Sequence, residues 1–162
     1  MKKLLFAAVA FIFSANCTMA QIPNVKVENG KGEMISASSL VDGKTPLVIS
    51  FWSTTCKPCI RELNTINDQL EDWKEEVDFR VIAVSTDDSR SASKAKAMAA
   101  GNGWEDFTVL YDKNQELKRA MNVNLTPQIF VTDGNGKIVY SHTGYSQGSE
   151  MEVLKTLKKL KK

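Results

Sequence analysis

The spacing of apolar residues along the chain predicts alternating strands and helices. Residues 46–52 form a largely apolar run of strand length, which is typical of a strand buried on both faces of a sheet. Residues 79–85 and 107–111 are runs of the same kind. From residue 60 to residue 73, apolar side chains recur at spacings of three and four, and this period predicts an amphipathic helix.

Shorter segments complete the pattern. Residues 91–100 are rich in Ala and Lys and are expected to be helical, and Asp112 is expected to cap a short helix. Residues 128–142 contain two apolar runs around Asp-Gly-Asn-Gly, which predicts a hairpin. A second hairpin is predicted over residues 25–35, and a last helix over residues 151–160.

The resulting order is ββ, then βαβαβα, then ββα. It predicts an α/β protein with a central, mainly parallel but mixed sheet flanked by helices. The first hairpin is an N-terminal extension, and the closing hairpin is expected to add antiparallel edge strands. Residues 21–162 are enough for a single domain with a substantial core, and no repeat or linker divides them.

Residues 1–20 are predicted to be a secretory signal peptide. Two lysines precede an apolar stretch of about ten residues, which is followed by small or polar residues up to a predicted cleavage site after Ala20. The apolar stretch is shorter than the roughly 20 residues that a membrane-spanning helix needs. Cleavage after Ala20 predicts a protein exported to the periplasm or cell envelope of a bacterium. Lipid attachment at Cys17 is a rival, which the preceding Asn16 disfavours.

Loss of this leader would leave the chain formally neutral. The full sequence holds 21 basic and 19 acidic residues, and the leader contains two lysines and no acid, so 19 of each remain. This balance gives no support to nucleic acid as a partner. The lysines of residues 155–162 fall at the end of the last predicted helix, where cations complement the helix dipole.

The cysteines carry the most specific chemical signal. Cys17 is expected to leave with the leader, so Cys56 and Cys59 remain. A disulfide that closes so short a ring constrains the unfolded chain very little, which argues against a purely structural bond. The pair is therefore interpreted as redox-active. A copper carrier that binds Cu(I) through Cys56, Cys59 and His142 is the alternative, because soft thiolates suit that ion.

A helix that begins at Cys56 would activate its thiol. The first N–H groups of a helix lack intrahelical partners and carry partial positive charge, so a thiolate placed there is stabilised. Lys57 adds a cation, and Pro58 suits the first turn because its missing N–H is not needed there. Cys59 lies one turn further on and is expected to be more enclosed. Cys56 would attack a disulfide, and Cys59 would resolve the mixed disulfide.

A strand that ends in Phe51-Trp52, followed by Cys56-Lys57-Pro58-Cys59 at a helix start, resembles the thioredoxin fold. The export signal, the N-terminal hairpin and a helix–strand inserted between residues 85 and 111 resemble the TlpA-type family of envelope thiol:disulfide oxidoreductases in particular. The resemblance covers residues 22–160. It implies a thioredoxin-like domain that reduces or forms disulfides through its two cysteines and needs no cofactor.

The same resemblance implies a substrate-binding surface beside the cysteines. In the family, the proline that corresponds to Pro127 is cis and faces the cysteine pair, and the backbone of its neighbour pairs with a bound peptide. The expected substrate-binding residues are Trp52, Lys57, Pro58, Thr126 and Pro127. The alternative, without a role in binding, is that Thr126-Pro127 forms an ordinary turn at the start of a strand.

Glu62 is the third candidate for a catalytic role. It lies three residues after Cys59, at the margin of the apolar stripe, so its carboxyl is expected to be partly buried. Similar proteins carry a glutamate here that acts near the buried thiol, and a desolvated carboxyl could move the proton that Cys59 gains or loses. The alternative is an exposed helix acid paired with basic neighbours.

Several positions depart from related sequences. Thr55 stands where a tryptophan is frequent, and Gln128 follows Pro127 where threonine is frequent. Asn64 replaces a common proline, so the helix is expected to lack its usual kink. A peroxidase is disfavoured, because a peroxidatic motif needs proline and threonine at the positions that Ile49 and Ser53 occupy.

The prediction is therefore an exported oxidoreductase that acts as a reductant. Its expected substrates are disulfide-bearing envelope proteins, such as apocytochrome c. In an oxidising compartment a reductant needs a source of electrons, so a membrane-embedded thiol reductase is an expected partner. The protein is expected to be a monomer.

Overall fold

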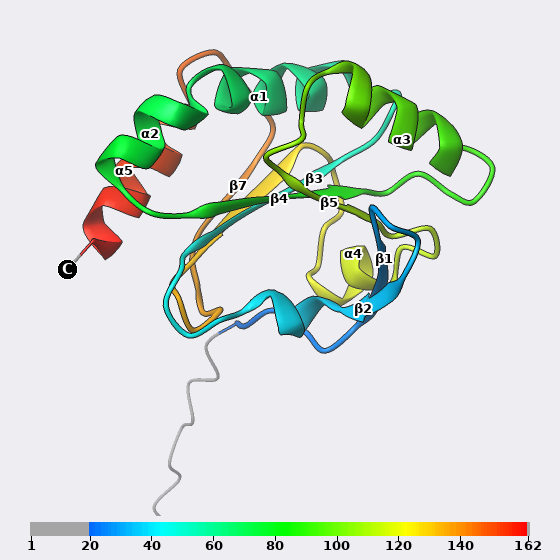
Figure 1. The fold of residues 1–162 in the computed structure, drawn as a ribbon, viewed down its shortest axis with the longest axis horizontal. Helices are drawn as coiled ribbons and strands as arrows, with labels where there is room; N and C mark the ends of the chain where they lie inside the picture. The colour runs from blue at the N-terminus through cyan, green and yellow to red at the C-terminus, as the bar shows by residue number, and fades with distance from the viewer. Residues whose placement is uncertain (1–19, 162) are drawn as a thin grey trace, which may run out of the picture.

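The computed structural model describes residues 20–161, which form one seven-stranded sheet with helices packed on it (Figure 1). The strands are β1 (Lys26–Asn29), β2 (Met34–Ser36), β3 (Leu47–Trp52), β4 (Arg80–Ser85), β5 (Thr108–Tyr111), β6 (Gln128–Thr132) and β7 (Ile138–Thr143). The helices are the 3₁₀ turn η1 (Ala37–Leu40) and α1 (Lys57–Asp68), α2 (Leu70–Glu76), α3 (Ala92–Gly101), α4 (Glu116–Ala120) and α5 (Glu150–Leu160).

The sheet is mixed, as the order of elements predicted. Its strand order is β2-β1-β5-β4-β3-β6-β7, with β3, β4 and β5 parallel and the other neighbours antiparallel. The closing hairpin was expected to add edge strands, but only one of its two strands lies at an edge. β6 pairs with β3 on one side and with β7 on the other, and β7 is the edge strand of the pair. The two cysteines therefore follow a central strand whose residues are all buried.

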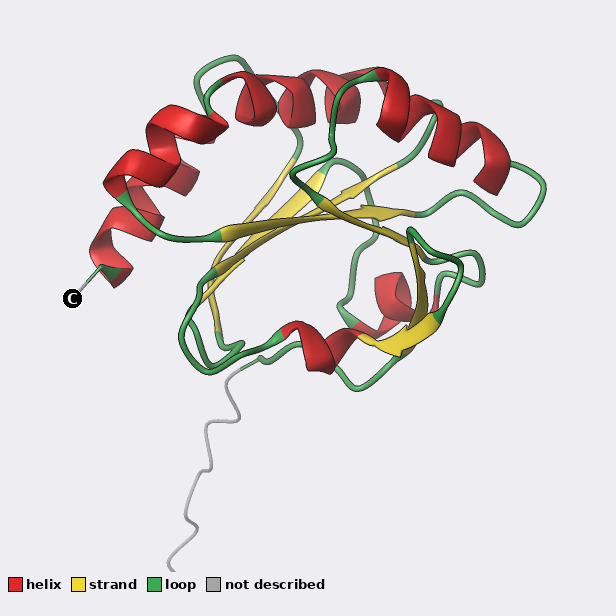
Figure 2. Cartoon of the chain, viewed as in Figure 1, coloured by secondary structure: helices red, strands yellow, loops and turns green. Residues whose placement is uncertain are grey.

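Alternating side chains of β3 point into two separate apolar cores. Leu47, Ile49 and Phe51 belong to one core with residues of β1 and α4. Val48 and Trp52 belong to the other, which is closed by residues of α1, α2, α3 and α5. Figure 2 shows α1, α2 and α3 as an arc of helices over the sheet, with α4 and the 3₁₀ turn on the opposite side.

The helix after the cysteines is divided, where a single helix to residue 73 was expected. α1 runs without interruption through Asn64, in keeping with the absence of a proline there, and ends at Asp68. Gln69, with φ −106° and ψ 3°, separates it from α2. Asp112 does cap α4 as predicted, since its carboxylate accepts hydrogen bonds from the N–H groups of Leu117 and Lys118.

The inserted α3–β5 unit is joined to α1 by polar side chains. Trp104 Nε1 donates to Asn64 Oδ1 at 2.9 Å, and Asn64 Nδ2 donates to Asn102 Oδ1 at 3.1 Å. One turn further along α1, Asn67 Nδ2 donates to the carbonyl of Gly103 at 3.1 Å. Asn64, at the position where the resemblance implied a proline, thus connects α1 to the inserted α3–β5 unit.

The N-terminal hairpin is held to the same insertion. Glu28 on β1 forms ion pairs with Lys96 of α3, at 2.8 Å, and with Lys113 after β5. The expected leader lies outside the described residues except for Ala20, and so does Cys17. Within residues 20–161, no helix has the length and apolar character needed to cross a membrane.

Candidate functional site

The turn from β3 into α1 brings the two cysteines together. Cys56 is the N-cap of α1, and Pro58 lies in the first turn, as the sequence predicted. Cys56 and Cys59 form a disulfide, with their Cα atoms 5.3 Å apart. The backbone N–H of Cys59 points at the Cys56 sulfur at 3.3 Å. A thiolate formed on Cys56 would thus lie against the unpaired N–H groups of the helix start, which favour negative charge.

The two sulfurs differ in their access to solvent. The Cys59 side chain is completely buried among residues of α1 and the sheet, whereas Cys56 is partly exposed at the rim of the same core. Lys57 is exposed beside Cys56, and Pro58 is half-buried. An incoming disulfide can therefore reach Cys56 first, and Cys59 is protected until a mixed disulfide has formed next to it.

Glu62 lies inside the protein rather than on the helix surface. Its side chain is 3% exposed and accepts a hydrogen bond from Ser50 Oγ on β3 at 2.8 Å. Burial, with a smaller contribution from the nearby Glu150 carboxyl, raises the pKa of this carboxyl to about 7, against the lowering effect of the Ser50 bond. The alternative of an exposed, ion-paired glutamate is wrong, and the carboxyl is placed to hold or release a proton near neutral pH.

Trp52 does not lie where a substrate could touch it. Its side chain is completely buried and packs edge-on against Trp104, with ring centroids 5.0 Å apart and an interplanar angle of 88°. Among the described residues, its indole N–H has no hydrogen-bond partner. The expectation that Trp52 contacts substrate is therefore wrong. The alternation of β3 turns this side chain inward, between the sheet and the inserted unit.

The loop before β6 has the backbone form that the resemblance implied. The Thr126–Pro127 peptide bond is cis, and the Pro127 carbonyl accepts a hydrogen bond from the N–H of Gly144 at 2.8 Å. Thr126 is partly exposed and Pro127 is buried. Leu125, which no pattern in the sequence singled out, is 70% exposed. An apolar side chain so open to water, directly before this loop, is a further candidate for contact with substrate.

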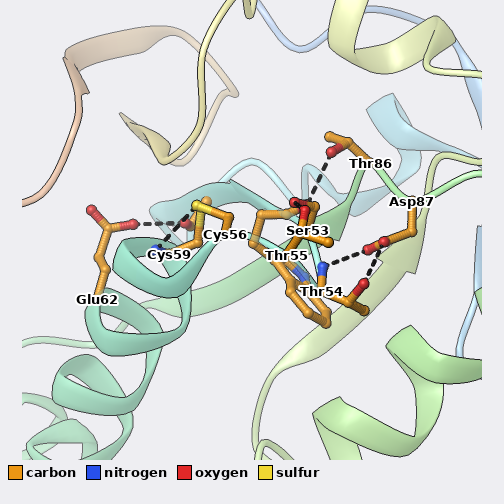
Figure 3. The surroundings of a disulfide bond; sticks show 10 residues. Ser53, Thr54, Thr55, Cys56, Cys59, Glu62, Thr86 and Asp87 are labelled. Atoms are coloured by element: carbon orange, nitrogen blue, oxygen red, sulfur yellow. Dashed lines mark hydrogen bonds between the residues drawn. A yellow bond between two sulfur atoms is a disulfide. The ribbon is translucent and has the colours of Figure 1, made fainter. Parts of the chain in front are cut away.

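Asp87 is a second residue that the sequence did not single out, and it contacts the turn that precedes Cys56. Asp87, just after β4, is 9% exposed and accepts hydrogen bonds from the N–H and the hydroxyl of Thr54 (Figure 3) and also from the hydroxyl of Ser85. Its place follows from the pairing of two strands that the sequence had already predicted. β3 and β4 are parallel, with Trp52 opposite Ser85, so polar residues after Ser85 had to lie beside the turn that leads to Cys56.

The ligands of the copper alternative are not assembled. His142 is exposed on β7, opposite Ile129 of β6. Within residues 20–161, no three His, Cys, Asp or Glu side chains gather in a way that could hold a metal ion. Among these residues, Cys56, Cys59 and His142 are therefore not found together in such a group.

Known proteins resemble the chain over most of its length. Residues 18–141 match the model of the AhpC/TSA family. The thiol-disulfide oxidoreductase ResA of Bacillus thuringiensis is 30% identical over 132 residues, which are 82% of this chain and 73% of that protein. The thiol:disulfide interchange protein DsbE of Tatumella citrea is 30% identical over 125 residues, 76% of this chain and 63% of that protein. A thioredoxin-like protein from Porphyromonas gingivalis, solved in solution, superposes with a TM-score of 0.77 and 49% identity, covering 88% of this chain and 93% of that one.

Proposed function

This chain belongs to the AhpC/TSA family and is a thiol:disulfide oxidoreductase of the ResA/DsbE type, and we propose that it acts after export, as a reductant of disulfides in envelope proteins. The observation that carries the proposal is the asymmetric pair at the start of α1, with a partly exposed Cys56 joined to a buried Cys59. The relatives named for disulfide chemistry support it.

The reaction is a two-electron exchange between the cysteine pair and a substrate disulfide. The Cys56 thiolate attacks one substrate sulfur, the substrate S–S bond breaks, and a mixed disulfide forms. Cys59 then loses its proton and attacks the Cys56 sulfur, which releases the second substrate thiolate and closes the Cys56–Cys59 disulfide. The substrate is reduced and the protein is oxidised.

Glu62 is proposed to take the proton that Cys59 loses. The two residues are one helical turn apart, and a carboxyl with a pKa of about 7 is divided between its charged and neutral forms at neutral pH. The carboxylate accepts a proton during resolution and returns it when the disulfide is reduced again. Burial of both groups keeps bulk water away from this exchange.

The substrate is proposed to bind over Cys56 as an extended peptide. Thr126, partly exposed before the cis proline, offers backbone groups to such a peptide, and Lys57 and Pro58 flank the reactive sulfur. Disulfide-bearing envelope proteins, including apocytochrome c, are the proposed substrates. A membrane-embedded thiol reductase would return the protein to its dithiol form.

Export is supported by the composition of residues 1–20, which fits a signal peptide removed to leave a monomeric domain of residues 21–162. The periplasm or cell envelope is the proposed location, with lipid attachment at Cys17 as the less favoured route. A compartment in which disulfides persist is one in which such a reductant has substrates.

The midpoint potential of the Cys56–Cys59 pair tests the direction of electron flow. Equilibration with glutathione or dithiothreitol buffers should give a value near or below the roughly −270 mV of thioredoxin, and the reduced protein should reduce insulin disulfides. The Cys56→Ser variant is the control and should be inactive. A potential near the roughly −120 mV of the oxidant DsbA would contradict the reductive role.

A further inference from the structure

The turn that carries Cys56 is held by a side chain from a different strand end. Residues 53–55 connect β3 to α1, and Asp87 follows β4. We propose that Asp87 is a positioning residue of the redox site, which acts through Thr54 to keep the Cys56 sulfur at the start of α1. The proposal rests on the proposed function, because it assigns a residue to the same thiol chemistry.

Three hydrogen bonds converge on the Asp87 carboxylate. Its Oδ2 accepts from the backbone N–H of Thr54 at 2.9 Å and from Ser85 Oγ at 2.9 Å, and its Oδ1 accepts from Thr54 Oγ1 at 2.8 Å. Thr54 is 8% exposed and Ser85 is completely buried. Buried bonds to a carboxylate are stronger than exposed neutral ones, so the position of Thr54 is well determined.

The position of Thr54 in turn fixes Cys56. The N–H of Cys56 donates to the carbonyl of Ser53 at 3.1 Å, which closes the turn around Thr54. Cys56 itself lies outside the helical region, with φ −88° and ψ 88°, so α1 alone does not dictate its conformation. In Figure 3, Thr54 and Asp87 lie on one side of this turn and the disulfide on the other.

The contact matters most in the reduced protein. In the oxidised form, the bond to Cys59 keeps the Cys56 sulfur at the helix start. Reduction removes that bond, and the turn then has to hold the thiolate against the N–H of Cys59 without covalent help. If the turn loosens, the thiolate spends less time at the favourable helix start, and Cys56 becomes less reactive at neutral pH.

Neighbouring contacts do not replace this role. Thr86 holds the end of β3, because its N–H and its hydroxyl both donate to the Trp52 carbonyl, at 2.8 and 3.1 Å. Those bonds stop at the last residue of the strand. Asp87 instead holds the turn itself, because its carboxylate binds Thr54, which lies two residues before Cys56.

Substitutions can separate the effect of the Asp87–Thr54 hydrogen bonds from the effect of the negative charge of Asp87. In Asp87→Asn, the amide oxygen can accept from the Thr54 N–H and from Ser85, while the amide nitrogen donates to the Thr54 hydroxyl, so all three bonds are retained without the charge. Asp87→Ala removes the bonds and the charge together. Thr54→Val removes one bond and keeps the charge, and Thr54→Ser restores the hydroxyl.

The measurement is the pH dependence of Cys56 alkylation in the reduced full-length protein, read by mass spectrometry of the labelled peptide. We expect Asp87→Ala and Thr54→Val to react more slowly than wild type at pH 7, by about tenfold and about threefold, because each lost hydrogen bond has an effect of this order. The midpoint should move to higher pH, and the rate at high pH should not change. Asp87→Asn and Thr54→Ser should remain within about twofold of wild type.

Val27→Ala is the control for lost stability, because it removes buried apolar atoms from the opposite core. It should lower Tm and leave the alkylation midpoint unchanged. Lys57 and Glu62 are the same in every variant, so their charges influence all the profiles equally. If Asp87→Asn shifts the midpoint as far as Asp87→Ala does, the charge acts and not the contact, and the proposal is wrong.

The same data separate this proposal from the proposed function. A wild-type midpoint at the ordinary cysteine pKa of about 8.5 would contradict an activated Cys56 and would overturn both. A lowered wild-type midpoint that Asp87→Ala does not change would overturn the role of Asp87 alone. A lowered midpoint that rises in Asp87→Ala and Thr54→Val, but not in Asp87→Asn, supports both.

Discussion

Replacing Glu62 with glutamine should make the protein more stable at neutral pH and above. The wild-type carboxyl has a pKa of about 7 in the folded protein, against 4.5 for an unperturbed glutamate. Between these two values, the folded state holds more protons than the unfolded state, so the free energy of unfolding falls as the pH rises. Above about pH 7 the loss is complete, and at about 1.4 kcal/mol for each pH unit it amounts to about 3 kcal/mol.

Glu62→Gln keeps the shape of the side chain and cannot ionise. Its amide oxygen can still accept from Ser50, so the contact seen at 2.8 Å is retained. The difference in unfolding free energy between variant and wild type should therefore grow from about pH 4.5 to about pH 7 and then level off. A constant offset of about 1 kcal/mol, from the unpaired amide nitrogen, does not affect that slope.

Urea unfolding of the oxidised protein from pH 4 to pH 8 measures this difference directly. Glu71→Gln, on the exposed surface of α2, is the matched control and should give a nearly flat difference curve. A curve for Glu62→Gln that is equally flat would refute the argument, because it would show that burial does not raise the pKa of this carboxyl. An increase of about 3 kcal/mol would support a proton acceptor poised near neutral pH.

Four further outcomes are expected. In the native reduced protein, Cys56 should be alkylated first, and the completely buried Cys59 should react only after unfolding; faster labelling of Cys59 in timed mass spectra would reverse their roles. Cys59→Ala should trap substrates as mixed disulfides on non-reducing gels and Cys56→Ala should not, since only Cys56 attacks. Glu150→Gln should lower the NMR titration midpoint of Glu62, because a nearby negative charge is removed. Leu125→Ser should lower kcat/KM for insulin by a few-fold and not for a small disulfide, and equal effects on both would exclude an apolar contact with polypeptide.

The order of elements and the central chemistry could be predicted because each has a local signature. Apolar runs of strand length identified β3, β4 and β5, and the two cysteines at a helix start identified the reactive pair. Glu62 could also be placed, since its position at the margin of an apolar stripe indicates partial burial. What the sequence could not supply was its partner, because Ser50 reads as one polar residue within a run that is buried on both faces.

Two of the errors came from contacts between distant segments. Trp52 lies next to the redox motif in sequence, yet the insertion supplies Trp104 to cover it, and no local pattern reports that contact. Asp87 reads as a loop acid until β3 and β4 are paired in register. The break between α1 and α2 at Gln69 is not marked by a proline or glycine in the sequence. The period of the apolar residues therefore favoured one continuous helix.

The hydrogen bonds between α1 and the insertion limit how this fold can be rearranged. Asn64 and Asn67 are matched to Trp104 and Gly103, so the inserted helix and strand are not an independent cassette. A chimera that receives the insertion of a relative would leave the side-chain amides of Asn64 and Asn67 without their matched hydrogen-bond partners. Grafting should succeed only when the outward face of α1 is exchanged together with the insertion, which makes the two segments a single unit of inheritance and of design.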